Sequence, residues 1–492
     1  MSVWSFLSIA APAAMACACG FDRTGFADGD GGPADAAGLD APLDAQGFDA
    51  TAPPDPLEAG DVRLIFGVSG SNQLQDLRRA ADRTWIAEPP TDMFAEVPWL
   101  VHRIGPDENA TEFLMTADGS DGGPEIRVTR LVEGQWVVDW RVVHGLSVSL
   151  AARGFDLEFE QSGDALAVYG IGTDTPAYRI FTAGEWSVER IVPLNDGMPN
   201  PNPDTNAGLV RWVELERRPG TDEIAMVFAD DRETLVAMVW NGDVWELDSG
   251  TDLEDRLKVN PVTSVVSNRV FDVAFEATSG DVVAAWGKQN SLGFLYSVFN
   301  ATTRVWTPGT NIAALSGTPH YVDLASDPTT DQIVGGFYDL GDGTERLGVG
   351  VWNGLSWIDT FEIDSQITDV NDGAIGDFPG EVAFLHGTGY AICTYANDAP
   401  GQINYARWQP GFSWALQAPL SIVGMGQARS HDLVVLPGGN AALLVASDDA
   451  SQLFSVVIDG DTGISLDDDP APLTSGLADR PSTPFSVDVR AQ

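Results

Sequence analysis

The chain has few basic residues. Its 492 residues include 26 Lys and Arg against 72 Asp and Glu, so the formal net charge is −46 and the isoelectric point is about 4.1. A protein that binds nucleic acid normally has a basic face and a high isoelectric point, so nucleic acid is not an expected partner. The same charge disfavours adhesion to anionic membranes and is typical of solubility in a salty or extracellular medium.

Cysteine is almost missing. The three cysteines are Cys17, Cys19 and Cys393, and the first two lie in an apolar N-terminal stretch. A disulfide framework is therefore excluded for the rest of the chain. We expect Cys393, in "YAICTYA", to be a small buried apolar residue.

Motifs for catalysis and cofactors are also missing. The sequence has no H-E-x-x-H, no P-loop, no G-x-G-x-x-G after a strand and no G-x-S-x-G elbow, and its 5 histidines lack metal-ligand spacing. We therefore name no catalytic residue, no cofactor and no metal centre. Calcium stays possible at the acidic turns "DGSDGGPE" (118–125) and "DLGDGTE" (339–345), although neither matches the twelve-residue calcium loop.

The N-terminal stretch is the longest apolar run. Residues 3–19, "VWSFLSIAAPAAMACAC", are few for a membrane span, and 14–16 fit a small-x-small cleavage site. We predict a signal peptide over 1–19. The cysteines are typical of a bacterial lipoprotein signal with Cys17 or Cys19 lipidated, although no basic residue precedes the run and Ala stands three residues before each cysteine.

Residues 20–61 are rich in Asp, Ala, Gly and Pro, with few large apolar side chains. Such a segment cannot bury enough surface to offset its ordering entropy, so we predict a disordered, extended acidic tether. An acidic tether behind an export signal resembles surface lipoproteins of Gram-negative bacteria. We expect an extracytoplasmic protein, either secreted or an outer-membrane or cell-surface lipoprotein, which touches the membrane only through a lipid anchor.

A short turn phrase ending in tryptophan repeats through 62–492, and five of its seven copies contain Gly. "WNGLSW" at 352–357 has counterparts such as "VEGQW", "TAGEW", "WNGDVW" and "QPGFSW", spaced 50 to 61 residues apart. An eighth turn, "VIDGDTGISL" at 457–466, lacks the tryptophan. The phrase is therefore a structural repeat and not a unique aromatic site, and it ends at Trp85, Trp136, Trp186, Trp245, Trp306, Trp357 and Trp414.

Each repeat contains four short runs rich in β-branched and aromatic residues, divided by Gly, Asp, Asn and Pro turns. The segment 320–361 shows all four. Four strands in about 50 residues are typical of a β-propeller blade. The first repeat lacks an opening strand, and "PFSVDVRAQ" at 484–492 resembles the missing one. We predict an all-β chain: a single, monomeric propeller of eight four-stranded blades, with seven as the alternative, closed by the C-terminal strand.

The repeats resemble those of secreted bacterial β-propeller repeat proteins, through the "WNG..W" phrase and the "DL" of the opening strands. They are distantly similar to the Asp-box repeats of sialidases. The Asp-box carries Ser or Thr and Asp ahead of Gly-x-x-Trp, whereas this chain has "WNG", "TAG", "VEG" or "QPG" there. The resemblance therefore implies the fold and not the function.

A basic residue stands three positions before an acid in the opening strand of five repeats. Opening strands are innermost in a propeller, so these side chains are expected at the mouth of the central channel. They form either a cationic ring that binds carboxylate, sulfate or phosphate oxygens, or ion pairs that join neighbouring blades. The residues are Arg153, Arg211, Arg269, His320 and Arg429.

Two functions follow. The first is a non-catalytic binding or scaffold propeller for an extracellular protein or an acidic glycan. The alternative is a glycan-active enzyme, a sialidase-like hydrolase or a lyase, which uses the channel mouth, where Tyr321 and Asp323 are the only candidate pair. The two are distinguished by whether carboxylates converge there on an arginine-lined pocket that holds one sugar.

Overall fold

The computed structural model describes residues 59–68, 73–80, 83–92, 99–107, 110–118, 125–143, 153–194, 208–257, 269–289, 293–312, 319–341, 344–364, 380–396, 399–463, 472–474, 477 and 485–490. The predicted signal peptide, Cys17, Cys19 and most of the tether lie outside these residues. So do 119–124 and 342–343, within the two acidic turns considered for calcium. In the described part of the chain, no helix is long and apolar enough to cross a membrane.

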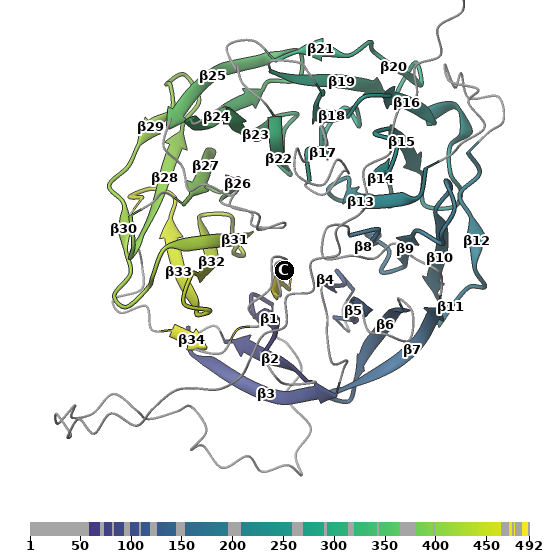
Figure 1. Cartoon of the computed structure of the whole chain (residues 1–492), viewed down its shortest axis with the longest axis horizontal. Helices are drawn as coiled ribbons and strands as arrows, with labels where there is room; N and C mark the ends of the chain where they lie inside the picture. The colour runs from purple at the N-terminus through teal and green to yellow at the C-terminus, as the bar shows by residue number, and fades with distance from the viewer. Residues whose placement is uncertain are drawn as a thin grey trace, which may run out of the picture. The chain divides into compact units, whose positions relative to one another are not determined.

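The described residues form eight antiparallel sheets that follow one another around a ring (Figure 1). Blade 1 contains β1 (Val62–Gly67), β2 (Gln73–Arg79), β3 (Trp85–Asp92) and β35 (Phe485–Val489). Blade 2 contains β4 (Trp99–Ile104), β5 (Glu112–Asp118), β6 (Glu125–Val132) and β7 (Gln135–Val143). Blade 3 contains β8 (Phe155–Phe159), β9 (Ala165–Tyr169), β10 (Ala177–Thr182), β11 (Glu185–Trp186) and β12 (Arg190–Ile191). Blade 4 contains β13 (Val210–Arg217), β14 (Ile224–Asp230), β15 (Leu235–Trp240), the 3-10 turn η2 (Leu247–Ser249) and β16 (Thr251–Glu254).

The second half of the ring repeats this plan. Blade 5 contains β17 (Phe271–Phe275), β18 (Val282–Gly287), β19 (Phe294–Asn300), β20 (Val305–Trp306) and β21 (Thr310–Asn311). Blade 6 contains β22 (Pro319–Ser326), β23 (Ile333–Gly341), β24 (Thr344–Trp352) and β25 (Trp357–Asp364). Blade 7 contains β26 (Gly380–Leu385), β27 (Tyr390–Tyr395), β28 (Gln402–Trp408), β29 (Ala415–Leu416) and β30 (Leu420–Ser421). Blade 8 contains β31 (Ala428–Val435), β32 (Ala441–Asp448), β33 (Leu453–Asp459) and β34 (Pro472–Thr474).

The C-terminal strand closes the ring. β35 pairs with β1 in an antiparallel register from Val62↔Val489 to Phe66↔Phe485, and so supplies the inner strand of blade 1. The inner strands β35, β4, β8, β13, β17, β22, β26 and β31 each contact the next one around the channel. The predicted eight-bladed propeller and its closure are therefore confirmed, and seven blades are excluded.

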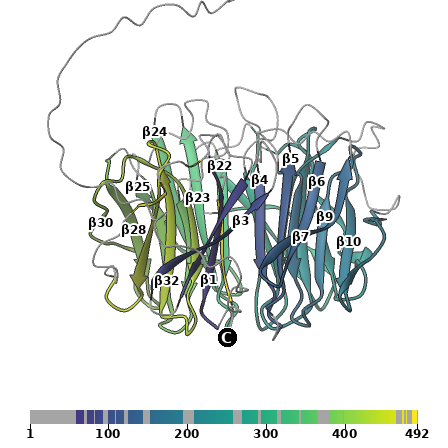
Figure 2. The ribbon, with the colours of Figure 1, turned by 90° about the horizontal axis from the view of Figure 1, so that it is seen from below.

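The blades stand side by side with their strands running between the two faces of the ring (Figure 2). Because a blade has a neighbour on each side, both faces of its middle strands are covered: all seven residues of β14 are buried. One apolar cluster continues from Phe113 in blade 2 through Phe159, Trp212 and Phe271 to Trp286 in blade 5. Cys393 is buried in β27, and burial raises the pKa of its thiol.

The repeated phrase forms the turn into the outer strand. In "WNGLSW", Gly354 has φ of +87°, a conformation that glycine adopts without a steric cost. The side chain of Asn353 accepts hydrogen bonds from the backbone N–H groups of Leu355 at 3.1 Å and Ser356 at 3.0 Å. These bonds explain why Asn-Gly suits this turn in the two copies that carry it, "WNGDVW" and "WNGLSW".

The repeat tryptophans lie at or next to the outer strands. The indole N–H of Trp186 donates to Asp139 of the preceding blade at 3.0 Å, and its ring lies 5.0 Å from that of Phe113. The ring of Trp357 packs 5.3 Å from Phe337. Three further indoles reach the preceding blade in the same way: Trp85 to Ser455, Trp136 to Asp76 and Trp306 to the carbonyl of Ser249.

Candidate binding site at the channel mouth

A row of carboxyl groups lines the inner strands of six consecutive blades. Each acid lies on its inner strand just before an aliphatic residue, which packs between blades. We call these residues the inner acidic row: Asp156, Glu214, Asp272, Asp323, Glu381 and Asp432.

The inner acidic row links each blade to the next. Asp323 accepts a hydrogen bond from the backbone N–H of Val382, the residue after Glu381, at 2.7 Å. The inner edge of each sheet would otherwise leave such N–H groups without a partner beside the channel. The same bond joins Asp156 to Leu215, Asp272 to Leu324, Glu381 to Leu433 and Asp432 to Val487.

Two of the predicted arginines lie in this row. Arg153 pairs through Nη2 with Asp156 of its own blade at 3.5 Å and with Glu214 of the next blade at 2.5 Å. Its guanidinium also lies 5.5 Å from the ring of Trp212. The arrangement fits the interpretation in which these arginines join neighbouring blades.

Arg269, just before β17 of blade 5, repeats this arrangement with the acids of blades 5 and 6. Its Nη2 pairs with Asp272 of its own blade at 3.1 Å and with Asp323 of the next blade. Its Nε also lies 3.8 Å from Glu214 of the preceding blade. Arg269 therefore contacts carboxyl groups of three successive blades.

The other three predicted residues are placed differently. Arg211 pairs with Asp231 in its own blade at 3.5 Å, His320 is buried in β22, and Arg429 is exposed on β31. Each lies where the pairing of the inner strand shifts register: between Val210 and Trp212, between Pro319 and Tyr321, and between Ala428 and His431. Such an irregularity re-aims side chains, so these three do not extend the pairs made by Arg153 and Arg269.

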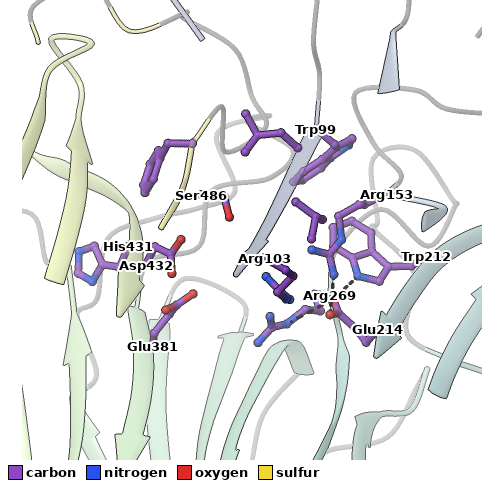
Figure 3. Close-up of a pocket in the computed structure, with 13 residues that line it drawn as sticks. Trp99, Arg103, Arg153, Trp212, Glu214, Arg269, Glu381, His431, Asp432 and Ser486 are labelled. Carbon is purple, nitrogen blue, oxygen red and sulfur yellow. Dashed lines mark hydrogen bonds and ion pairs between the residues drawn. The ribbon is translucent and has the colours of Figure 1, made fainter. Parts of the chain in front are cut away.

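A cavity of about 150 Å³ opens where the inner strands begin. Its described lining residues come from every blade except blade 6, so the site depends on ring closure. In Figure 3, Arg103, Arg153, Arg269 and Glu214 lie on one side, and Glu381, His431 and Asp432 on the other. The described residues that line it are Trp99, Leu100, Val101, Arg103, Arg153, Trp212, Glu214, Arg269, Glu381, His431, Asp432, Phe485 and Ser486.

Sequence reasoning missed Arg103, Glu381 and the aromatic lining residues Trp99, Trp212 and Phe485. Arg103 comes from β4, where the pattern has no acid, and its Nε pairs with Glu158 of blade 3 at 3.1 Å. Glu381 lacks the basic residue three positions earlier, because Phe378 stands there. The signal that could have found it is the acid–aliphatic pair Glu381-Val382, which continues the row without an arginine.

Burial governs the charge of this site. Desolvation raises the pKa of Asp156 and Asp432 to about 6 and that of Asp272 to about 8. It also raises the pKa of Glu381 well above its usual value, and Asp432 adds to this effect. Burial lowers the pKa of His431 to about 3, so its ring is neutral. The row therefore carries less negative charge near neutral pH than its composition implies.

The site offers hydrogen-bond donors and acceptors close together. Guanidinium groups only donate, while carboxyl oxygens accept and, when protonated, also donate. Among the described residues, no group of three or more His, Cys, Asp and Glu is arranged to hold a metal ion. The arrangement suits a ligand with many hydroxyl groups, which donate and accept at every position.

Comparisons with known proteins support the fold alone. No family model and no curated protein matches the chain. A solved structure of the dihydro-heme d1 dehydrogenase NirN is 14% identical with a TM-score of 0.52, covering 86% of this chain and 76% of that one. The BP39L lectin of Burkholderia pseudomallei is 12% identical with a TM-score of 0.49, covering 75% and 98%. The periplasmic gluconolactonase PpgL of Pseudomonas aeruginosa is 14% identical with a TM-score of 0.43, covering 88% and 99%.

Proposed function

We propose that this chain is a binding propeller that holds a glycan at the mouth of its central channel. The observation that carries the proposal is the cavity at the start of the inner strands, lined by guanidinium and carboxyl groups from several blades. Ligand sites are concave and fix orientation through a few convergent polar groups. The cavity has this form, and ring closure holds its lining on rigid strands.

Binding is favoured over catalysis by the state of the arginines. Arg153 and Arg269 are already held by carboxylates of neighbouring blades. A guanidinium used in this way cannot leave its partner to follow a reacting group without leaving a buried charge unpaired. It can still donate through its remaining N–H groups to a ligand hydroxyl.

The second candidate is a glycan-active enzyme. Glu381 and Asp432 both line the cavity and both have a raised pKa. Glycoside hydrolysis commonly uses two carboxyl groups, one of them a general acid with a raised pKa. These two residues, and not Tyr321 and Asp323, are the pair that the cavity favours for such a reaction.

One experiment tests both candidates. The full chain is screened against neutral and acidic glycans, affinities are measured by calorimetry, and each bound glycan is then assayed for new reducing ends. We expect binding without turnover. A folded Arg103→Gln variant should bind more weakly, and its melting temperature should also fall because Glu158 and Asp156 lose an ion-pair partner. Arg346→Gln, on the exposed Arg346–Glu362 pair of blade 6, is the matched control.

The outcomes separate the candidates. Release of reducing ends would establish the enzyme in place of the binding module. Absence of binding to every glycan would overturn both, and an extracellular protein would then be the partner to seek.

We also propose that the propeller is exported and tethered. The apolar residues 3–19, the cysteines and the acidic segment 20–61 support this. The test is metabolic labelling with a fatty acid in a Gram-negative host, comparing Cys17→Ser with Cys19→Ser. Labelling that is lost in one variant identifies the lipidated residue. If the wild-type chain takes up no fatty acid, neither cysteine is lipidated and the protein is secreted without an anchor. Retention in the cytoplasm would overturn export.

A further inference from the structure

We propose that the group entering the cavity is a single uncharged sugar ring, and that Glu381 and Asp432 receive its hydroxyl groups. This rests on the proposed function and names the ligand class of the same site. It departs from the acidic glycan expected from the arginine pattern.

The size of the cavity limits what can enter it to one ring. Its volume is about 150 Å³, and a cavity of roughly this volume in another protein admits benzene. A longer glycan would therefore place one residue inside and leave the rest outside. Trp99 and Trp212 form one wall, with ring centroids 5.2 Å apart in a T-shaped contact.

Recognition must come from the polar groups. The exposed fractions of Trp99, Trp212 and Phe485 are only 2%, 1% and 3%, so these side chains shape the wall without offering an open face for stacking. A ring held here is bound mainly through its hydroxyl groups. This favours a polyhydroxylated ligand over an apolar one of the same size.

The acceptors are available on one side. Glu381 uses Oε2 to accept from Leu433 at 2.7 Å, and Asp432 uses Oδ2 to accept from Val487 at 2.9 Å. The described residues supply no hydrogen-bond partner for Oε1 of Glu381 or Oδ1 of Asp432. Both residues line the cavity, opposite the guanidinium groups (Figure 3). A hydroxyl group can reach these oxygens without breaking the link between blades.

The balance of charge disfavours an anionic ligand. In the described part of the chain, the cavity and its ion pairs contain the three guanidinium groups of Arg103, Arg153 and Arg269. Against them stand seven carboxyl groups, the six of the inner acidic row and Glu158, which pairs with Arg103. The carboxylate of an acidic sugar would enter beside Glu381 and Asp432, which no described guanidinium pairs with directly. At the test pH of about 8, Asp432 is above its pKa of about 6 and carries a charge. Like charges in a partly buried site raise the free energy of binding.

The test compares sugars that differ in one group. Methyl glucoside and methyl galactoside are titrated into the full chain by calorimetry at about pH 8, beside methyl glucuronide and methyl galacturonide, in which a carboxylate replaces the C6 hydroxymethyl group. We expect at least one neutral sugar to bind roughly tenfold or more tightly than its acidic counterpart, as loss of a hydrogen bond to a charged group implies.

Two variants assign the residues. Asp432→Asn and Glu381→Gln each keep an oxygen that can accept the backbone N–H of the next blade, so the propeller should keep its melting temperature. We expect Asp432→Asn to weaken the neutral sugar by roughly tenfold, with Glu381→Gln as a second, independent variant. Arg346→Gln is the control on the outer part of blade 6 and should bind as the wild type does.

Each outcome decides one question. Equal or tighter binding of the acidic sugar would overturn this inference and leave the binding propeller intact. Unchanged affinity in both folded variants would overturn the assignment of Glu381 and Asp432. Absence of binding by every sugar, including longer glycans in the screen above, would overturn the proposed function itself.

Discussion

Oδ2 of Asp272 accepts a hydrogen bond from the backbone N–H of Leu324 at 2.7 Å, across the boundary between blades 5 and 6. The same carboxylate pairs with Arg269 at 3.1 Å. The side chain of Asp272 thus accepts a hydrogen bond from the inner strand of the next blade and forms an ion pair with an arginine of its own blade. These contacts help to fix the register between blades 5 and 6 at the channel.

This relationship predicts a large cost for removing the carboxylate. Asp272→Ala leaves the Leu324 N–H and part of the Arg269 charge buried without partners, so we expect a loss of about 3 kcal/mol in the free energy of unfolding. Asp272→Asn keeps an acceptor and should lose less. Urea denaturation followed by tryptophan fluorescence measures both.

The control is the exposed pair Arg346–Glu362, where Arg346→Ala should cost at most about 0.5 kcal/mol. An Asp272→Ala variant as stable as Arg346→Ala would show that the apolar blade contacts alone set the register.

The indole N–H groups between blades give a second prediction. Trp240 donates to Oε1 of Glu160 in blade 3 at 2.7 Å, and burial raises the pKa of Glu160 to about 7 while this bond lowers it. Trp240→Phe removes the bond, so we expect a loss of about 1 kcal/mol or more beyond the loss of ring volume. The pKa of Glu160 should rise further.

Trp245→Phe is the matched control for that ring volume, because Trp245 is also buried and its Nε1 has no hydrogen-bond partner among the described residues. Melting curves of the two variants give the difference. Equal losses would mean that the bond to Glu160 contributes nothing.

The buried carboxyl groups predict an unusual dependence on pH. Burial raises the pKa of Asp156 and Asp432 to about 6 and that of Asp272 to about 8, from 3.8. Between about pH 4 and pH 8 the folded chain keeps protons that the unfolded chain has released, so the free energy of unfolding falls as pH rises. Below this window both states are protonated, and above it the full cost is present.

Melting temperatures at about pH 5 and about pH 8 test this prediction, in about 0.5 M sodium chloride to screen repulsion between surface carboxylates. We expect the higher value at the lower pH, and a smaller difference for Asp272→Asn. A melting temperature that rises with pH would contradict the prediction, because it would require native carboxylates with lowered pKa values.

The sequence predicted the elements that every blade repeats. Tryptophan recurs at the position of Trp357 in seven of the eight blades, and five of those copies also have the glycine of Gly354, because the blades share a turn and an outer strand. The strand that the first repeat lacks was predicted from the number of strand-like runs in each repeat. The partners of single side chains were harder to predict. Arg153 and Arg211 have the same spacing to their acids, but the irregular pairing at Val210 and Trp212 directs Arg211 to Asp231.

The candidate site differs from the repeat, and this explains why it was only partly predicted. Arg103 occupies a blade without the acid, and Glu381 a blade without the arginine. A repeat pattern finds what the blades share, whereas a cavity on the axis is formed by what they do not share. Its lining depends on which side chains of different blades converge, and that requires the closed ring.

The last prediction concerns this closure. β35 covers Val62 and Leu64 of β1, which are fully buried, and Phe485 and Val487 pack in the same apolar cluster. Deleting 484–492 would remove the inner strand of blade 1, expose the edge of β1 and remove Ser486 from the cavity. We expect the truncated chain to aggregate or to elute as large oligomers in size-exclusion chromatography, whereas deleting only 491–492 should leave a monomer. A soluble monomeric truncation with an unchanged melting temperature would mean that seven complete blades and an open one suffice. In that case, any loss of sugar binding in this variant would measure the contribution of Ser486 and Phe485 to the site.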